Sequence, residues 1–171
     1  CDTASPVSAD TWESALWSAH TAAHAAKKVL AGDAACYALS RPPGHHATRE
    51  VASGFCYLNN TAIAAAVLRT KHARMAILDV DLHHGNGTQE VFYERPDVFT
   101  VSIHADPVRF YPFFWGYAEE RGSGAGQGFN LNLPLPRGTG DEDYLRTLDA
   151  AINSIRKFAP GAIVIALGLD A

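Results

Sequence analysis

The chain has 171 residues, 47% of them hydrophobic, which suits one globular unit with an ordinary core and excludes a disordered composition. Its net charge of −4 excludes a strongly basic nucleic-acid binder and weakly favours cationic partners through long-range attraction. No segment approaches the roughly 18 uninterrupted apolar residues of a membrane span, and no charged-then-apolar signal opens the sequence, so we expect no membrane contact.

The hydrophobic pattern predicts helices and strands that alternate along the chain. Apolar residues recur at helical spacing over 10–31, and Gly32 follows as a typical helix stop. In chain order we expect a helix at 10–31, a strand at 35–39, a helix at 59–68, a strand at 75–80, a helical turn at 87–94, strands at 98–104 and 131–135, a helix of about 18 residues capped by Asp141, and a buried strand at 162–169. This alternation predicts an α/β fold with a parallel sheet flanked by helices.

The two ends of the sequence suggest the central part of a larger domain. The chain starts at Cys1 without a methionine and stops at Ala171, directly after an apolar run that ends in Asp170. Parallel strands need crossover connections that bury their faces. We therefore expect residues 1–171 to form one domain that is incomplete at both ends.

The three cysteines bear on the cellular compartment. Cys1, Cys36 and Cys56 form an odd set without a Cys-x-x-Cys pair, which fits neither a disulfide framework nor a cysteine zinc cluster. We therefore expect a reducing, cytoplasmic location, with Cys56 as a small buried apolar residue. His20 and His24 are four residues apart on a helix, but without a nearby glutamate they are expected to lie at the surface.

The apolar run 75–78 ends in two carboxylates and two imidazoles. The run lacks polar alternation, which is typical of a parallel strand buried on both faces, and ligands of such sheets gather at the carboxyl ends of the strands. A spacing of two directs Asp81 and His83 to one side of an extended chain, with Asp79 one step deeper. One divalent cation can then bind a carboxylate and an imidazole, and Asp170, after the last predicted strand, is the best-placed third ligand.

Two adjacent histidines, His45 and His46, lie in a proline-stiffened loop after the strand predicted at 35–39. Histidine titrates near neutrality, so a fixed pair beside a metal-activated water can act as general base toward that water and general acid toward a leaving amine. Each imidazole needs an orienting partner. Asp79 can raise the basicity of one, and Asn86 can hydrogen-bond the other without adding charge, which would separate their pKa values.

Together these motifs resemble the zinc-dependent deacetylase family, which comprises histone deacetylases and bacterial acetylpolyamine amidohydrolases. The matching segments, in the family's order and approximate spacing, are 41–46, 54–60, 79–87, 100–104 and 168–170. The resemblance implies the arginase/deacetylase-like fold, an α/β parallel sheet flanked by helices. It also implies that residues 1–171 belong to a single catalytic domain.

The resemblance further implies site residues at the positions that match the family's motifs. Zinc, or alternatively ferrous iron, is expected at Asp81, His83 and Asp170, and an acid/base pair at His45 and His46, with Asp79 and Asn86 as their orienting partners. A structural potassium is expected at Asp79, Asp81 and Ser102. The acyl-amide channel is expected to be lined by Gly54, Phe55 and Tyr111.

The long aromatic and glycine-rich loop 106–128 is similar to that of the acetylpolyamine amidohydrolases, whereas histone deacetylases have a shorter loop here. Such an insertion can narrow the channel and build a dimer contact. We therefore expect a small cationic acetylamine as substrate and a homodimer formed through this loop, with protein acetyl-lysine as the alternative substrate. Glu119 and Glu120 could attract ammonium groups, although exposed glutamates commonly do no more than solvate a loop.

One feature of the family is missing from this sequence. The family places a tyrosine after two glycines to hydrogen-bond the developing oxyanion, and no Gly-Gly-Tyr occurs here. We expect that tyrosine outside residues 1–171, so these residues alone should be inactive. A non-catalytic acyl-ligand binding module remains an alternative. A binuclear hydrolase of the arginase type needs Asp-x-His-x-Asp, but position 85 is glycine, which favours one catalytic metal.

Overall fold

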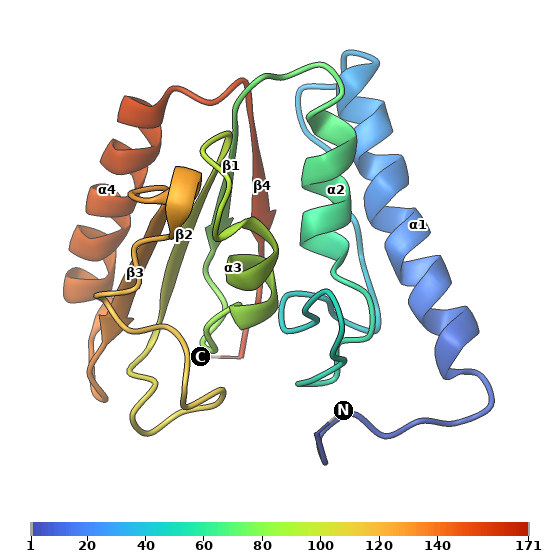
Figure 1. Cartoon of the computed structure of the whole chain (residues 1–171), viewed down its shortest axis with the longest axis horizontal. Coiled ribbons are helices and arrows are strands. Elements are labelled where there is room, and N and C mark those ends of the chain that lie inside the picture. The colour runs from blue at the N-terminus through green and yellow to red at the C-terminus, as the bar shows by residue number, and fades with distance from the viewer. Residues whose placement is uncertain (1, 171) are drawn as a thin grey trace.

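The structure, a computed structural model that describes residues 2–170, is a parallel sheet between two layers of helices (Figure 1). The four strands have the order β3-β2-β1-β4, and all three pairings are parallel. Their bounds are β1 Met75–Asp79, β2 Val98–Ala105, β3 Asn130–Leu135 and β4 Ala162–Ala166. The helices are α1 Thr11–Leu30, α2 Asn60–Leu68, α3 Asn86–Phe92 and α4 Asp141–Phe158, with a 3-10 turn η1 at Gly124–Gly126. The predicted fold class is confirmed.

Strand β1 pairs with β2 on one edge and β4 on the other, and its side chains alternate between two cores. Met75 and Ile77 pack with α2 and α3, whereas Ala76 and Leu78 pack with α4 on the other face. Burial of each of the larger side chains contributes about 1.5–3 kcal/mol. The same alternation directs Asp79, which is 3% exposed, to the α2 and α3 side of the sheet.

The segment 35–39, predicted as a strand, is not one. Tyr37 and Leu39 are 68% and 78% exposed, and the segment has no sheet partner among residues 2–170. Its composition suits a strand, but backbone groups form a ladder only where a neighbouring strand receives their hydrogen bonds. The prediction was therefore wrong because local pattern does not supply a partner.

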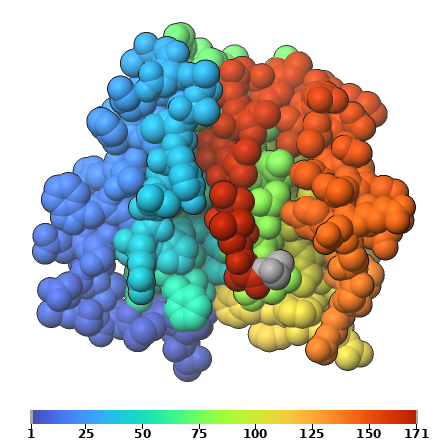
Figure 2. Space-filling model, turned by 180° about the vertical axis from the view of Figure 1, so that it is seen from behind, coloured from blue at the N-terminus to red at the C-terminus, as the bar shows by residue number. Residues whose placement is uncertain are grey.

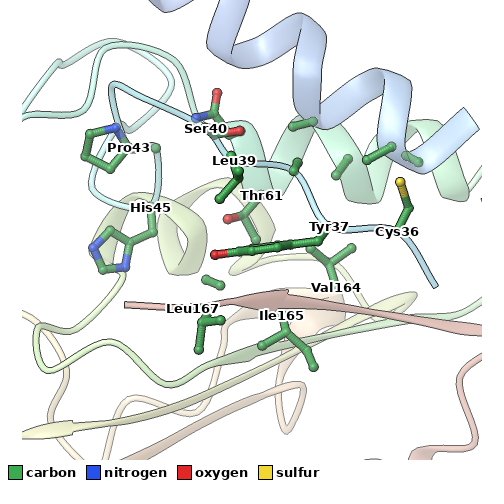
Figure 3. Close-up of a pocket in the computed structure, with 18 of the residues that line it drawn as sticks. Cys36, Tyr37, Leu39, Ser40, Pro43, His45, Thr61, Val164, Ile165 and Leu167 are labelled. Atoms are coloured by element: carbon green, nitrogen blue, oxygen red, sulfur yellow. The ribbon is translucent and has the colours of Figure 1, made fainter. Parts of the chain in front are cut away.

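The prediction of a buried strand at 162–169 was wrong in length and in burial. Among the described residues β4 pairs only with β1, so it is an edge strand, and Ile165 is 60% exposed. Figure 2 shows this red segment at the surface, beside the cyan residues that precede α2. A cavity of about 450 Å³ lies between them; Tyr37 and Leu39 line one side, Val164 and Leu167 the other (Figure 3).

The N-cap of helix α4 lies one position earlier than the sequence predicted. Gly140 is the N-cap residue, and Asp141 is the first helical residue. Asp141, Glu142 and Asp143 occupy the first turn, where carboxylates interact favourably with the helix dipole. None of the described helices combines the length and apolar character that crossing a membrane requires.

Candidate active site

Asp81, His83 and Asp170 meet at the carboxyl ends of the neighbouring strands β1 and β4. The Nδ1 atom of His83 lies 3.2 Å from Oδ1 of Asp81 and 2.9 Å from Oδ2 of Asp170. Each of the three side chains offers a ligand atom within 4.8 Å of the others. The three residues that the sequence predicted as metal ligands are thus brought together, 87 positions separating His83 from Asp170 in the chain.

Backbone groups hold the two carboxylates in place. The backbone N–H of His83 donates to Asp81 Oδ1 at 2.8 Å, and that of Leu82 donates to Asp170 Oδ1 at 3.2 Å. Gly168 passes so close to the Asp81 carboxylate that a side chain at position 168 would collide with it. Contacts within the protein therefore position both carboxylates.

This donor set fits a zinc or ferrous ion. Two carboxylates and one imidazole match the nitrogen and oxygen ligands of catalytic zinc sites, which keep a position for water or substrate. Bonds of about 2.0–2.1 Å place tetrahedral ligand atoms about 3.3 Å apart, close to the two distances from His83. The hydrogen bond to Asp81 raises the pKa of His83, as expected where a positive charge is favoured between carboxylates.

The two adjacent histidines have different partners. Nδ1 of His45 lies 2.8 Å from Oδ2 of Asp79, and Nδ1 of His46 lies 2.8 Å from Oδ1 of Asn86. The rings are 4.0 Å apart between centroids, and the residues are only 7% and 5% exposed. The sequence predicted both partners without assigning them; the structure pairs Asp79 with His45 and Asn86 with His46.

These partners separate the pKa values of the pair. Burial disfavours the charged form of both rings. At His45 the negative charge and hydrogen bond of Asp79, with the charge of Asp81, outweigh burial, so the pKa is raised. At His46 burial and the neighbouring His45 lower the pKa to about 3. His46 is therefore neutral at neutral pH, whereas the carboxylates beside His45 favour protonation of its ring more than in an isolated imidazole.

Two of the three residues predicted to line the channel, Gly54 and Tyr111, lie against His46. The Tyr111 ring meets that of His46 edge-on, with centroids 4.9 Å apart and an interplanar angle of 88°. Gly54 has a φ of +53°, and a side chain there would collide with the His46 ring. Phe55, the next residue, is exposed. Glycine at position 54 thus leaves the space that His46 occupies.

Two parts of this region were not predicted from the sequence. Asp2 accepts hydrogen bonds from the Tyr111 hydroxyl at 2.6 Å and from the backbone N–H of Gly54 at 3.2 Å. Its pKa is lowered, chiefly by Tyr111. The carboxylate of Glu120 accepts hydrogen bonds from the Gln89 side chain and from the backbone N–H of Gly116, whereas the carboxylate of Glu119 is exposed. No local motif signals the Tyr111–Asp2 and Gln89–Glu120 contacts, because these partners are 109 and 31 positions apart.

The remaining candidate residues fall where the sequence predicted or close to it. His20 and His24 are exposed on α1. Cys36 and Cys56 are free, and burial raises the pKa of the Cys56 thiol to about 12, which makes it a poor nucleophile. Cys1 lies outside the described residues. Asp79 and Ser102 are register neighbours on β1 and β2, so two of the three residues expected at a potassium site are adjacent.

Comparison with known proteins gives one consistent family. Residues 1–171 match the model of the histone deacetylase domain. The acetylpolyamine amidohydrolase of Burkholderia pseudomallei is 53% identical over 169 residues, which are 99% of this chain and 50% of that protein. The acetylpolyamine amidohydrolase of Mycoplana ramosa is 48% identical over 96% of this chain and 48% of its own length.

Solved structures agree with these sequence matches. A crystal structure of the Burkholderia pseudomallei acetylpolyamine aminohydrolase has a TM-score of 0.98 at 53% identity, covering 99% of this chain and 50% of its own. A histone deacetylase homologue from Aquifex aeolicus has a TM-score of 0.88 at 34% identity, covering 96% of this chain and 44% of its own. The chain spans about half the length of the curated relatives it matches.

Proposed function

The chain belongs to the histone deacetylase family, and on this premise we propose that the natural protein is a metal-dependent deacetylase that hydrolyses acetylated amines, with acetylpolyamines as its substrates. One observation carries the proposal. Three ligand side chains converge beside a pair of buried imidazoles that have different orienting partners. The alternative substrate is acetyl-lysine in proteins.

Asp81, His83 and Asp170 would hold the metal, zinc or ferrous iron. When bound, such an ion polarises the amide carbonyl and lowers the pKa of a water molecule. The chain's own residues then handle the protons. His46, neutral and held at Nδ1 by Asn86, presents Nε2 as the base that removes a proton from the attacking water.

His45 has the complementary role. Asp79 holds its Nδ1 and favours the protonated ring, and its Nε2 lies 3.8 Å from Oδ2 of Asp81, beside the ligand cluster. We assign to it the stabilisation of negative charge that develops at the carbonyl and donation of a proton to the leaving amine. The hydroxide of the attacking water ends in the carboxyl group and its proton on His46, and the C–N bond breaks as His45 protonates the amine nitrogen. The carboxyl proton then returns to His45 and the His46 proton passes to the amine, so amide and water give acetate and ammonium and both atoms and charge balance.

The substrate assignment rests on the shape and charge around the histidines. The Tyr111 ring forms a wall against His46 and His83, which favours a slender acyl-amine over a bulky one. A net charge of −4 favours cationic amines and argues against nucleic acid as a partner. Four relatives named acetylpolyamine amidohydrolases are 45–53% identical to this chain.

Several further properties belong to the same proposal. Residues 1–171 form part of a single catalytic domain, since among residues 2–170 the apolar edge strand β4 has a pairing strand on one side only. The oxyanion-binding tyrosine lies outside them, so they are inactive alone. Potassium binds near Asp79, Asp81 and Ser102. The protein is cytoplasmic and forms a homodimer through loop 106–128, where Phe114 is exposed.

The test is acetate release by the complete natural protein, with acetylated polyamines and acetyl-lysine peptides as competing substrates. We expect faster release from the polyamines. Binding of acetylated amines without acetate release would instead favour the non-catalytic binding module, and faster release from the peptides would favour the protein deacetylase.

A further inference from the structure

The carboxylate of Glu120 anchors loop 106–128 to the rest of the fold through hydrogen bonds. Its Oε2 accepts three hydrogen bonds: from Nε2 of Gln89 at 2.6 Å, from the backbone N–H of Gly116 at 2.9 Å and from Nδ2 of Asn132 at 3.3 Å. Gln89 belongs to α3, Asn132 to β3 and Gly116 to the loop itself. A single atom therefore joins the loop to two elements of the fold.

The side-chain amides that donate to the carboxylate or the backbone carbonyl of Glu120 are themselves buried. Gln89, Asn130 and Asn132 are each 2% exposed. Asn130 donates to the backbone carbonyl of Glu120 at 2.7 Å, and Asn132 donates to that of Tyr117 at 3.1 Å. Buried amides left without partners cost about 1–3 kcal/mol each, so these bonds strongly favour one position of residues 116–120.

A second hydrogen bond, from His104, fixes the position of residues 116–120. His104 Nε2 donates to the backbone carbonyl of Gly116 at 2.9 Å. Gly116 has a φ of +106°, and a Cβ there would come within 2.7 Å of the His84 ring and 2.8 Å of the His104 ring. The loop is thus seated directly on the two imidazoles.

The anchored stretch connects to the wall of the candidate channel. The Tyr117 hydroxyl donates to the backbone carbonyl of Phe113 at 2.7 Å, and the Phe113 ring packs edge-on against Tyr111 at 6.2 Å. Tyr111 in turn packs against His46. A continuous set of contacts therefore leads from Glu120 to the ring that faces the acid/base pair.

We propose that Glu120 is a positioning residue that sets the width of the substrate channel through Tyr111, as a hydrogen-bond acceptor and not as a charge for the substrate's ammonium group. The selectivity part of this inference rests on the proposed function. The anchoring part does not, because it concerns only the position of residues 106–120.

Two substitutions separate geometry from charge. Glu120→Gln removes the charge but keeps an oxygen at the same reach, so it can still accept from all three donors. Glu120→Asp keeps the charge but withdraws the oxygen by one methylene. Glu119→Gln, at the exposed neighbouring carboxylate, is the matched control for charge on this loop.

The first measurement is hydrogen–deuterium exchange of the backbone amides of residues 106–120 in the complete natural protein. Glu120→Asp should accelerate exchange about tenfold, since a misplaced buried hydrogen bond shifts local opening by roughly that factor. Glu120→Gln and Glu119→Gln should exchange like the natural protein. Faster exchange in Glu120→Gln than in Glu120→Asp would overturn the anchoring role.

The second measurement is the ratio of kcat/KM for a slender acetylated polyamine to that for a bulky acetylated amine. Glu120→Asp should reduce this ratio, mainly through KM, at unchanged zinc content, while Glu120→Gln preserves it. Loss of the ratio in Glu120→Gln or Glu119→Gln would show that charge matters instead. If the natural protein releases no acetate, the proposed function fails, whereas hydrogen exchange still decides whether Glu120 anchors the loop.

Discussion

Oδ2 of Asp79 lies 2.8 Å from Nδ1 of His45, in a contact where both residues are buried. The bond directs the other ring nitrogen of His45 toward Asp81. It also places the negative charge of Asp79 next to His45 alone, because His46 is hydrogen-bonded to the neutral amide of Asn86. This asymmetry is what lets two identical side chains differ in protonation.

The contact depends on the absence of a side chain at position 85. Gly85 lies against the Asp79 carboxylate, and a Cβ there would collide with Oδ2 and come within 3.2 Å of His45 Nδ1. Gly85→Ala should therefore lower kcat at least about tenfold and destabilise the protein by about 1–3 kcal/mol, as overpacking does. Gly140→Ala, where an added methyl meets nothing within 4 Å, is the control for kcat.

Gly85→Asp provides a sharper test of the single-metal site. This change restores the Asp-x-His-x-Asp run of binuclear hydrolases, but the new carboxylate has to occupy the space of Asp79. We expect at most one zinc ion per chain, measured by elemental analysis. Two bound ions per chain would show that the site tolerates the arginase-type arrangement.

Metal binding should depend on the residues that converge at the ends of β1 and β4. His83→Ala and Asp170→Ala should each weaken zinc binding by more than roughly 100-fold, because loss of a direct ligand exceeds the 10–100-fold effect of an outer partner. Competition with a chromogenic chelator measures the change. His24→Ala, on the exposed face of α1, should leave affinity unchanged. Full affinity in either ligand variant would contradict the assignment.

Removing the proposed base should separate catalysis from metal binding. His46→Ala is expected to reduce kcat by about 10²–10⁴, the usual range for general acid–base catalysis, with one zinc retained. Asn86→Ala, which leaves the base but removes its orienting acceptor, should reduce kcat less. Unchanged turnover in His46→Ala would exclude this residue as the base; loss of zinc from it would indicate a structural role.

Stability should also depend on pH through Asp97, far from the metal ligands. Its carboxylate accepts hydrogen bonds from Arg95 at 3.0 and 2.9 Å, and this arginine, with the charge of Arg69, lowers its pKa. Because the pKa of Asp97 is lower in the folded protein, its ionised carboxylate stabilises the fold above the unfolded pKa of about 3.9. This stabilisation is lost as pH falls through the folded pKa.

We therefore expect Asp97→Asn to reduce the free energy of unfolding by up to about 1 kcal/mol at pH 7, a value limited by solvent screening of a partly exposed pair. The difference from the natural protein should shrink as pH falls below the unfolded pKa and through the lowered folded pKa of Asp97, as measured by urea denaturation. Asp33→Asn, in an exposed pair with Lys28, should change stability less at pH 7. A difference that grows toward low pH would have the wrong sign.

The elements that the sequence predicted well are those in which local pattern and tertiary environment agree. The run from Met75 to Leu78 is apolar on both faces and became the central strand, and the alanine-rich stretch ending at Leu68 became α2. Segment 35–39 and β4 have equally apolar sequences. Among the described residues, segment 35–39 has no strand beside it and β4 has one, whereas β1 has two. A strand needs hydrogen-bonding neighbours on its edges, and composition does not provide them.

The sequence by itself determined the family, the fold class and the set of polar residues that follow β1 and β4, because a period of two and the shared edge of a parallel sheet follow from backbone geometry alone. Only the tertiary structure decided which imidazole meets Asp79, that Glu120 turns inward, and that Asp2 bonds Tyr111. His45 and Asp79 are 34 positions apart, and Asp2 and Tyr111 are 109 apart. Contacts at such separations depend on how whole elements pack, and no local pattern encodes them.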